Sequence, residues 1–139
     1  GWLRVTAMTV GTWKGEKVWL AANYLYTRRT YLVKPKKALK KGYLLGGKVG
    51  SYVNAGFPLG VLCVDDTVLE LNQSPFRGTL YAAPLKKIVG VSNLLDARTT
   101  SIGLPEDNVI GPVRDKDDLI LLSREGRVYR LPLHPYILK

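Results

Sequence analysis

The sequence contains few of the side chains on which catalytic and metal sites usually depend. It has one cysteine, Cys63, and one histidine, His134. A single cysteine excludes an internal disulfide and a metal site built on several cysteine ligands. No P-loop, dinucleotide-binding glycine pattern or nucleophile elbow occurs either. We therefore predict a protein that is not an enzyme and has no catalytic residues and no metal site. A Cys63–His134 pair is the one nucleophilic alternative that folding could create.

Long apolar runs are also missing. The longest, residues 57–64 (FPLGVLCV), has eight residues, whereas a helix that spans a bilayer needs about 20. Arg4 and Thr6 interrupt the apolar stretch that a secretory signal would require. The sequence thus predicts a protein that is neither membrane-bound nor secreted. We expect it in the cytoplasm or in another reducing compartment that contains nucleic acid.

Acidic residues are scarce in the first 60 positions. Eleven lysine and arginine residues lie there against a single acid, Glu16, whereas residues 61–139 contain ten basic and ten acidic residues. The whole net charge of +10 therefore belongs to the first 60 residues. A field of one sign confined to one segment attracts polyanions. A charged surface that only keeps the protein soluble would have the same composition.

Short strand-forming segments, by contrast, are abundant. Segments rich in Val, Thr, Tyr and Trp predict β-strands over residues 2–10, 17–26, 29–34, 58–64, 67–71, 78–83, 118–122 and 127–131. The chain's 14 glycines and 8 prolines divide them. We predict an all-β fold, a small barrel or sandwich, with at most one short helix. That helix would cover residues 35–41, with Pro35 first and Gly42 just past its end.

The chain is expected to form one β domain over residues 1–139, with lobes at 1–41, 42–98 and 99–139. In the middle lobe, the spacing of Gly50, Val53, Gly56, Pro58 and Leu59 resembles that of lipoyl- and biotinyl-type domains, as does the later passage Ser74, Pro75 and Gly78. The resemblance implies a barrel-sandwich hybrid. In it, Gly56 would supply a turn with positive φ and Pro58 would open an edge strand.

Modified members of that family attach a prosthetic group to a lysine at a hairpin tip. The matching place here holds Asp65 and Asp66, and no lysine lies between Lys48 and Lys86. Because a carboxylate cannot form the required amide link, we predict a scaffold without a cofactor. The resemblance implies a structural module, as in adaptor proteins or in insertions of large nucleic-acid enzymes.

A second resemblance covers residues 117–133. Two strands flank a turn at residues 124–127, in which Gly126 suits a left-handed conformation. This unit resembles the strand–turn–strand part of a blade in the DNA-wrapping C-terminal domain of DNA gyrase. The blade repeats of that domain are missing, and a generic hairpin would have the same pattern.

The strongest candidate for a binding segment is residues 23–41 (NYLYTRRTYLVKPKKALKK). If residues 24–33 form a strand, Tyr24, Tyr26 and Arg28 share one face and Arg29 and Tyr31 the other. Aromatic rings stack on unpaired bases while cationic groups neutralise phosphates, whereas duplex binding needs only the charges. The predicted nucleic-acid-binding residues are Tyr24, Tyr26, Arg28, Arg29, Tyr31, Lys34, Lys36, Lys37, Lys40 and Lys41.

The function expected from these features is non-enzymatic binding of DNA or RNA, largely through phosphates, as a module of a larger nucleic-acid machine. Two alternatives stay open. The tyrosines could pack a core while the lysines are merely solvated, or the chain could be a structural component of a large particle that binds acidic protein partners.

Overall fold

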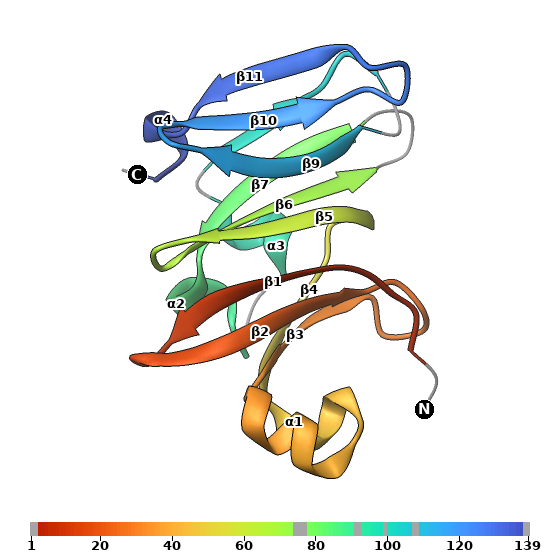
Figure 1. The fold of residues 1–139 in the computed structure, drawn as a ribbon, viewed down its shortest axis with the longest axis vertical. Helices are drawn as coiled ribbons and strands as arrows, with labels where there is room; N and C mark the ends of the chain where they lie inside the picture. The colour runs from red at the N-terminus through yellow and green to blue at the C-terminus, as the bar shows by residue number, and fades with distance from the viewer. Residues whose placement is uncertain (1–2, 74–77, 91–92, 99, 107–108, 138–139) are drawn as a thin grey trace.

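The computed structural model describes residues 3–73, 78–90, 93–98, 100–106 and 109–137, which form three antiparallel sheets stacked along the long axis of the molecule (Figure 1). Sheet 1 contains β1 (Val5–Trp13), β2 (Glu16–Asn23), β3 (Arg29–Val33) and β4 (Lys48–Val53). Sheet 2 contains β5 (Phe57–Val64), β6 (Thr67–Gln73), β7 (Gly78–Pro84) and β8 (Thr100–Gly103). Sheet 3 contains β9 (Ile110–Asp115), β10 (Asp118–Leu122) and β11 (Val128–Pro132).

The all-β prediction is confirmed. Within the described ranges the strand order of each sheet is linear, so the sheets are open and stack on one another without closing into a barrel. The sheets occupy residues 5–53, 57–103 and 110–132, so their boundaries differ from the expected lobe boundaries at 42 and 99. The cause is β4, which lies in the middle lobe by sequence but pairs with β3 in sheet 1.

The predicted helix is present as α1 (Pro35–Lys41), with the left-handed Gly42 (φ 81°) at its C-terminal end. Further short elements exceed the single helix that was predicted. They are the 3-10 turn η1 (Leu44–Gly47) and the four-residue helices α2 (Leu85–Ile88), α3 (Leu94–Ala97) and α4 (His134–Ile137). Asn93 caps α3 by accepting a hydrogen bond from the Asp96 amide at 2.9 Å. None of the described helices is long and apolar enough to cross a membrane.

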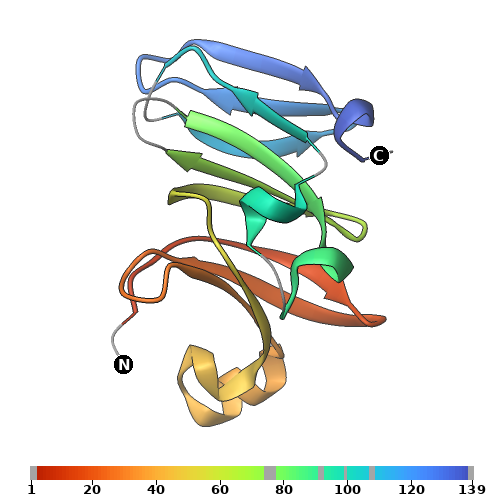
Figure 2. The ribbon, with the colours of Figure 1, turned by 180° about the vertical axis from the view of Figure 1, so that it is seen from behind.

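Sheet 2 is buried on both faces. Its side facing sheet 1 contributes Val61, Val68 and Tyr81 to one core cluster, which α2 and α3 close from the side (Figure 2). Its other side contributes Leu69 and Leu71 to a second cluster, shared with sheet 3. A strand buried on both faces is apolar at almost every position, which explains the unbroken apolar run of β5. A third, smaller cluster joins the outer face of sheet 1 to α1 and η1.

The β5–β6 hairpin has the two-residue tip expected from the sequence, since Val64 pairs with Thr67 around Asp65 and Asp66. Pro58 does lie in an edge strand, because β5 ends the order of sheet 2. The expected positive φ of Gly56 is wrong, because Gly56 is not among the described glycines with that geometry. Its amide instead donates to Asn72 Oδ1 at 2.7 Å. The passage at Ser74 and Pro75 lies outside the described residues.

A buried polar network connects sheet 1 to sheet 2. The carboxyl group of Glu70, on β6, accepts hydrogen bonds from the Tyr52 hydroxyl and from Asn72 Nδ2 at 3.0 Å. Thr30 Oγ1 lies 2.9 Å from Glu70 Oε2 and 2.6 Å from Asn54 Oδ1. Since a hydroxyl carries one hydrogen, Thr30 can donate to only one of these two acceptors. A proton on Glu70 lets both contacts be hydrogen bonds at once.

The environment of Glu70 also favours the protonated acid. Burial raises the pKa of the Glu70 carboxyl, and the hydrogen bonds from Tyr52, Asn72 and Thr30 lower it in part. The folded protein therefore retains this proton at pH values where the unfolded chain has lost it.

The stability of the protein should consequently fall as the pH rises through the folded-state pKa of Glu70. Between the unfolded and folded pKa values the native state binds more protons than the unfolded chain. The free energy of unfolding therefore falls with rising pH, by at most about 1.4 kcal/mol per pH unit for one proton. We expect the Glu70→Gln protein to lack this fall in stability with pH, because its side chain does not titrate. Urea unfolding of both proteins across the pH range measures it, and the same pH dependence in the two proteins would contradict the assignment.

Sheets 2 and 3 approach each other closely at two glycines, Gly60 and Gly111. A Cβ atom added to Gly60 would lie 1.6 Å from the Gly111 carbonyl oxygen, a backbone atom that cannot move aside. We expect Gly60→Ala to lower the free energy of unfolding by about 1–3 kcal/mol or more, as overpacking does. Gly78→Ala is the matched control, because its nearest neighbour would be 3.6 Å away. Equal denaturation midpoints for the two variants would refute this account of the contact.

Candidate nucleic-acid interface

The lysines of α1 project from a helix that has no acid of its own. Ala38 faces the core, while Lys36, Lys37, Lys40 and Lys41 are exposed. The first turn contains no acid, and no side chain caps the N-terminus. The structure therefore places four positive charges on seven residues of helix.

The pairing of sheet 1 brings further lysines to the same end. The β1–β2 hairpin turns at residues 14–15, so Lys14 and Lys17 lie at its tip. Lys48 pairs with Val33, the last residue of β3 before α1 begins. The lysines gathered at this end of sheet 1 are Lys14, Lys17, Lys34, Lys36, Lys37, Lys40, Lys41 and Lys48. We call them the lysine cluster.

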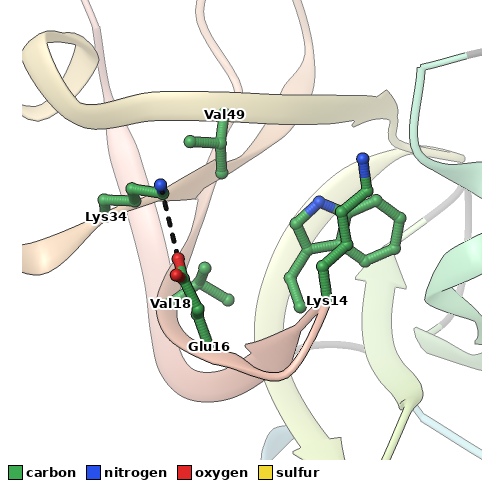
Figure 3. A pocket seen from close by; sticks show the side chains of 6 residues that line it. Lys14, Glu16, Val18, Lys34 and Val49 are labelled. Carbon is green, nitrogen blue, oxygen red and sulfur yellow. Dashed lines mark ion pairs between the residues drawn. The ribbon is translucent and has the colours of Figure 1, made fainter.

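Few carboxylates oppose the lysine cluster. In the described ranges its ion pair is Lys34 Nζ to Glu16 Oε2 at 3.3 Å, and Glu16 comes from the same basic segment (Figure 3). Asp65 and Asp66, at the tip of the neighbouring β5–β6 hairpin, border hollows near the β1–β2 tip. Among the described carboxylates of sheet 3 and its connections, Glu106, Glu125 and Asp118 pair with arginines of the same region instead.

The charge arrangement on α1 opposes the helix that carries it. Lys36 and Lys40, and likewise Lys37 and Lys41, are like charges four residues apart, which costs about 0.2–0.5 kcal/mol per pair. Positive charge near the helix N-terminus, at Lys36 and Lys37, is unfavourable as well, whereas Lys40 and Lys41 in the last turn are favourable to the helix dipole. An anion bound across these side chains would relieve both effects.

The predicted stacking face of tyrosines does not form. Residues 24–28 are a turn, in which Tyr26 (φ 60°) and Arg28 (φ 52°) adopt left-handed conformations, and β3 begins only at Arg29. Tyr24, Tyr26 and Arg28 therefore share no strand face, and the prediction of a strand over residues 24–33 is wrong at its beginning. Asn23 favours this turn, because its side chain donates to the Leu25 carbonyl at 2.8 Å.

Two of the three tyrosines are used within the fold. Tyr31 is only 3% exposed, and its hydroxyl lies 2.7 Å from Thr27 Oγ1. The Tyr24 ring packs against Phe57 with a centroid distance of 4.5 Å, and Arg28 lies over it. Tyr26 is 76% exposed and stands apart from the lysine cluster, at the opposite end of sheet 1. The residues predicted to form one site thus divide into two groups.

The arginines of the segment belong to the second group. Arg29 pairs with Val53 at the end of sheet 1 opposite the lysine cluster. Its guanidinium donates to Ser51 Oγ at 3.2 Å. The predicted residues that join the lysine cluster are Lys34, Lys36, Lys37, Lys40 and Lys41. Tyr24 and Arg28 contact each other at the opposite end of the sheet, and the buried Tyr31 lies under Lys48 of the cluster.

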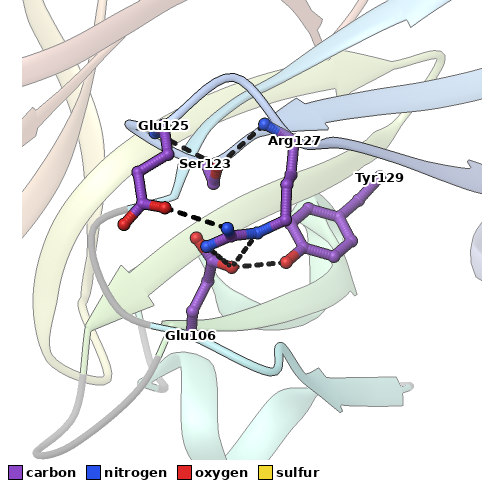
Figure 4. Close-up of polar contacts among 5 residues, drawn as sticks. All are labelled: Glu106, Ser123, Glu125, Arg127 and Tyr129. Carbon is purple, nitrogen blue, oxygen red and sulfur yellow. Dashed lines mark hydrogen bonds and ion pairs between the residues drawn. The ribbon is translucent and has the colours of Figure 1, made fainter.

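Two of the three basic residues of the predicted 117–133 hairpin, Arg127 and Arg130, pair with carboxylates of the same region. The hairpin is confirmed as β10 and β11, with Gly126 at φ 89°. Arg127 donates to Glu106 Oε2 at 2.8 Å and to Glu125 Oε2 at 3.0 Å (Figure 4). Hydrogen bonds from Tyr129 and Arg127 lower the pKa of the Glu106 carboxyl, which keeps this arginine neutralised.

Several members of the lysine cluster were missed at the sequence level. Lys14, Lys17 and Lys48 lie outside residues 23–41, as does Trp13, which borders the same end of sheet 1. The sequence of residues 11–15, with its two glycines, is typical of a turn, but only the strand register shows which residues this turn approaches.

Cys63 and His134 do not form a site. Cys63 packs against the cluster between sheets 1 and 2, whereas Leu133, next to His134, belongs to the cluster between sheets 2 and 3. The described parts of the chain contain no group of three or more His, Cys, Asp and Glu residues able to hold a metal ion. No known protein family, curated protein or solved structure matches this chain, so the two resemblances rest on the residues quoted above.

The environment of Cys63 makes it a weak nucleophile. Burial, with smaller contributions from Asp66 and Glu70, raises the pKa of its thiol to about 12. We expect iodoacetamide at pH 8 to alkylate the folded protein more slowly than the urea-unfolded chain by roughly two to three orders of magnitude. Mass spectrometry over time measures the two rates. Equal rates would show that the thiol ionises normally.

Proposed function

We propose that this chain binds nucleic acid without sequence preference, through phosphate contacts made by the lysine cluster, as a non-enzymatic module of a larger nucleic-acid machine. The observation that carries the proposal is the convergence of eight lysines on one end of sheet 1, with Glu16 as the only carboxylate in that sheet. Phosphate groups spaced along a strand can engage several lysines at once, and the release of their counterions drives binding.

The loss of the tyrosine face changes how the binding works. Without a face of stacked tyrosines, the contacts of α1 with nucleic acid are electrostatic. Single-stranded and double-stranded nucleic acids are therefore both suitable ligands. The net charge of the first 60 residues would also speed the encounter with any polyanion.

Substitution of the α1 lysines tests the proposal. We expect Lys36→Gln, Lys37→Gln, Lys40→Gln and Lys41→Gln together to weaken binding to duplex DNA and RNA. The plot of log affinity against log salt should become shallower by about 3 to 4 units if all four contact phosphates. Filter binding at several salt concentrations gives the slope, and circular dichroism checks the fold.

A control variant with the same loss of charge comes from the opposite end of the molecule. It combines Arg114→Gln, Lys116→Gln, Arg124→Gln and Arg130→Gln, whose residues belong to sheet 3 and its turns. The control variant should show the same slope of log affinity against log salt as the unmodified protein. An equal change of the slope in both variants would mean that only net charge matters. An unchanged slope in the α1 variant would refute the lysine cluster as the binding site.

An acidic protein partner is the second candidate function. It is favoured by two exposed apolar side chains beside the α1 lysines, Leu39 at 70% and Tyr43 at 61% exposure. A partner with carboxylates around an apolar centre would cover both kinds of group. Saturable binding to such a protein, with no binding to DNA or RNA at low salt, would select this function.

A further inference from the structure

Trp13 borders two hollows at the end of sheet 1 that carries the lysine cluster. The first, of about 340 Å³, lies between the β1–β2 hairpin, β4 and the start of α1. It is lined by Trp13, Lys14, Glu16, Val18, Lys34 and Val49. The second, of about 330 Å³, also borders Trp13 and Lys14, and its other walls include Asp66 of the β5–β6 turn and Leu85 and Lys86 of α2.

The lining of the first hollow combines an aromatic ring, apolar walls and two cations. Lys34 and Glu16 stand on one side and Lys14 on the other (Figure 3). Val18 is buried, and Trp13 is half-buried against the same core cluster. Lys14 Nζ lies 5.6 Å from the centre of the Trp13 ring. Glu16 is the one carboxylate among the described residues that line it, and its ion pair with Lys34 at 3.3 Å offsets its charge. The second hollow carries the carboxylate of Asp66 and suits an anion less well.

The chemistry of the first hollow matches a nucleotide better than a simple anion or a simple apolar group. An inorganic anion would make no favourable contact with an indole and two valines. An apolar ligand would leave the two lysines without a partner of opposite charge. A nucleobase offers a flat ring that stacks on aromatic side chains, and the attached phosphate needs positive charge nearby. The volume lies at the lower end of the range for small-ligand pockets, about 300–1,000 Å³.

The hollow is continuous with the proposed phosphate-binding surface. Lys34 is both a wall of the hollow and the N-cap residue of α1. A nucleic-acid strand whose phosphates contact the lysines of α1 would therefore pass the mouth of the hollow.

From this arrangement we propose that the hollow beside Trp13 takes up one unpaired base of a single strand, with its phosphate between Lys14 and Lys34. This deepens the proposed function and rests on it. The phosphate contacts of α1 supply affinity for any strand, and Trp13 adds a preference for strands with free bases.

Strands that differ only in their bases test the inference. The probes are a short oligothymidylate, an oligouridylate of the same length, and an abasic strand with the same number of phosphates. The unmodified protein should bind both base-bearing strands more tightly than the abasic one. Trp13→Leu, which keeps an apolar side chain but removes the ring, should reduce this preference by roughly 5- to 150-fold. Trp13→Phe should retain most of it.

A fluorescence measurement avoids any substitution at the site. In a Trp2→Phe, Trp19→Phe protein, Trp13 is the single tryptophan. Its emission should be quenched by oligothymidylate and much less by the abasic strand.

The two proposals fail in different ways. If the α1 lysine variant loses affinity for the abasic strand while Trp13→Leu keeps the full preference for bases, the Trp13 site is refuted and the proposed function stands. Equal quenching by both strands refutes the site as well. If the unmodified protein binds none of the strands at low salt, both proposals fall.

Discussion

The structure depends on the burial of sheet 2 on both of its faces. One face carries the core shared with sheet 1 and the other carries the core shared with sheet 3. Apolar contacts alone would let one sheet slide over the next, because they have little directionality. The hydrogen bonds of Glu70 with Tyr52 and Thr30 are directional, and they cross between sheets 2 and 1. A buried carboxyl group without partners would be costly. These bonds therefore fix the position of sheet 1 on the rest of the molecule.

The position of sheet 1 determines where its charges can lie. Its inner face is occupied by the core, and α1 and η1 cover part of its outer face. Charged side chains are consequently left at the two ends of the sheet and on α1. Because the β1–β2 turn and the start of α1 share one end, the lysines gather there and the arginines Arg28 and Arg29 lie at the other. The rest of the chain keeps its charges balanced through local pairs such as Arg127 with Glu106.

Strands with strong β propensity were predictable, whereas strands supported only by their neighbours were not. All eight predicted strands occur, but β4, β8 and β9 were not expected. β9 contains Gly111 and Pro112, which disfavour a strand, and its pairing with β10 supplies what local propensity does not. The error at Tyr24 and Tyr26 has the opposite cause. Both have high β propensity, yet the side-chain hydrogen bonds of Asn23 favour a turn.

The sequence by itself determined the β class, the helix between Pro35 and Gly42, and the confinement of excess positive charge to the first 60 residues, because propensity, helix capping and composition are local properties. Only the tertiary structure decided which charged groups meet and which aromatic rings stay accessible. Whether Tyr31 is buried and whether Trp13 borders a hollow depend on strand register and on the stacking of sheets, which arise from contacts between residues far apart in the chain. Such contacts leave no periodic pattern in a single sequence.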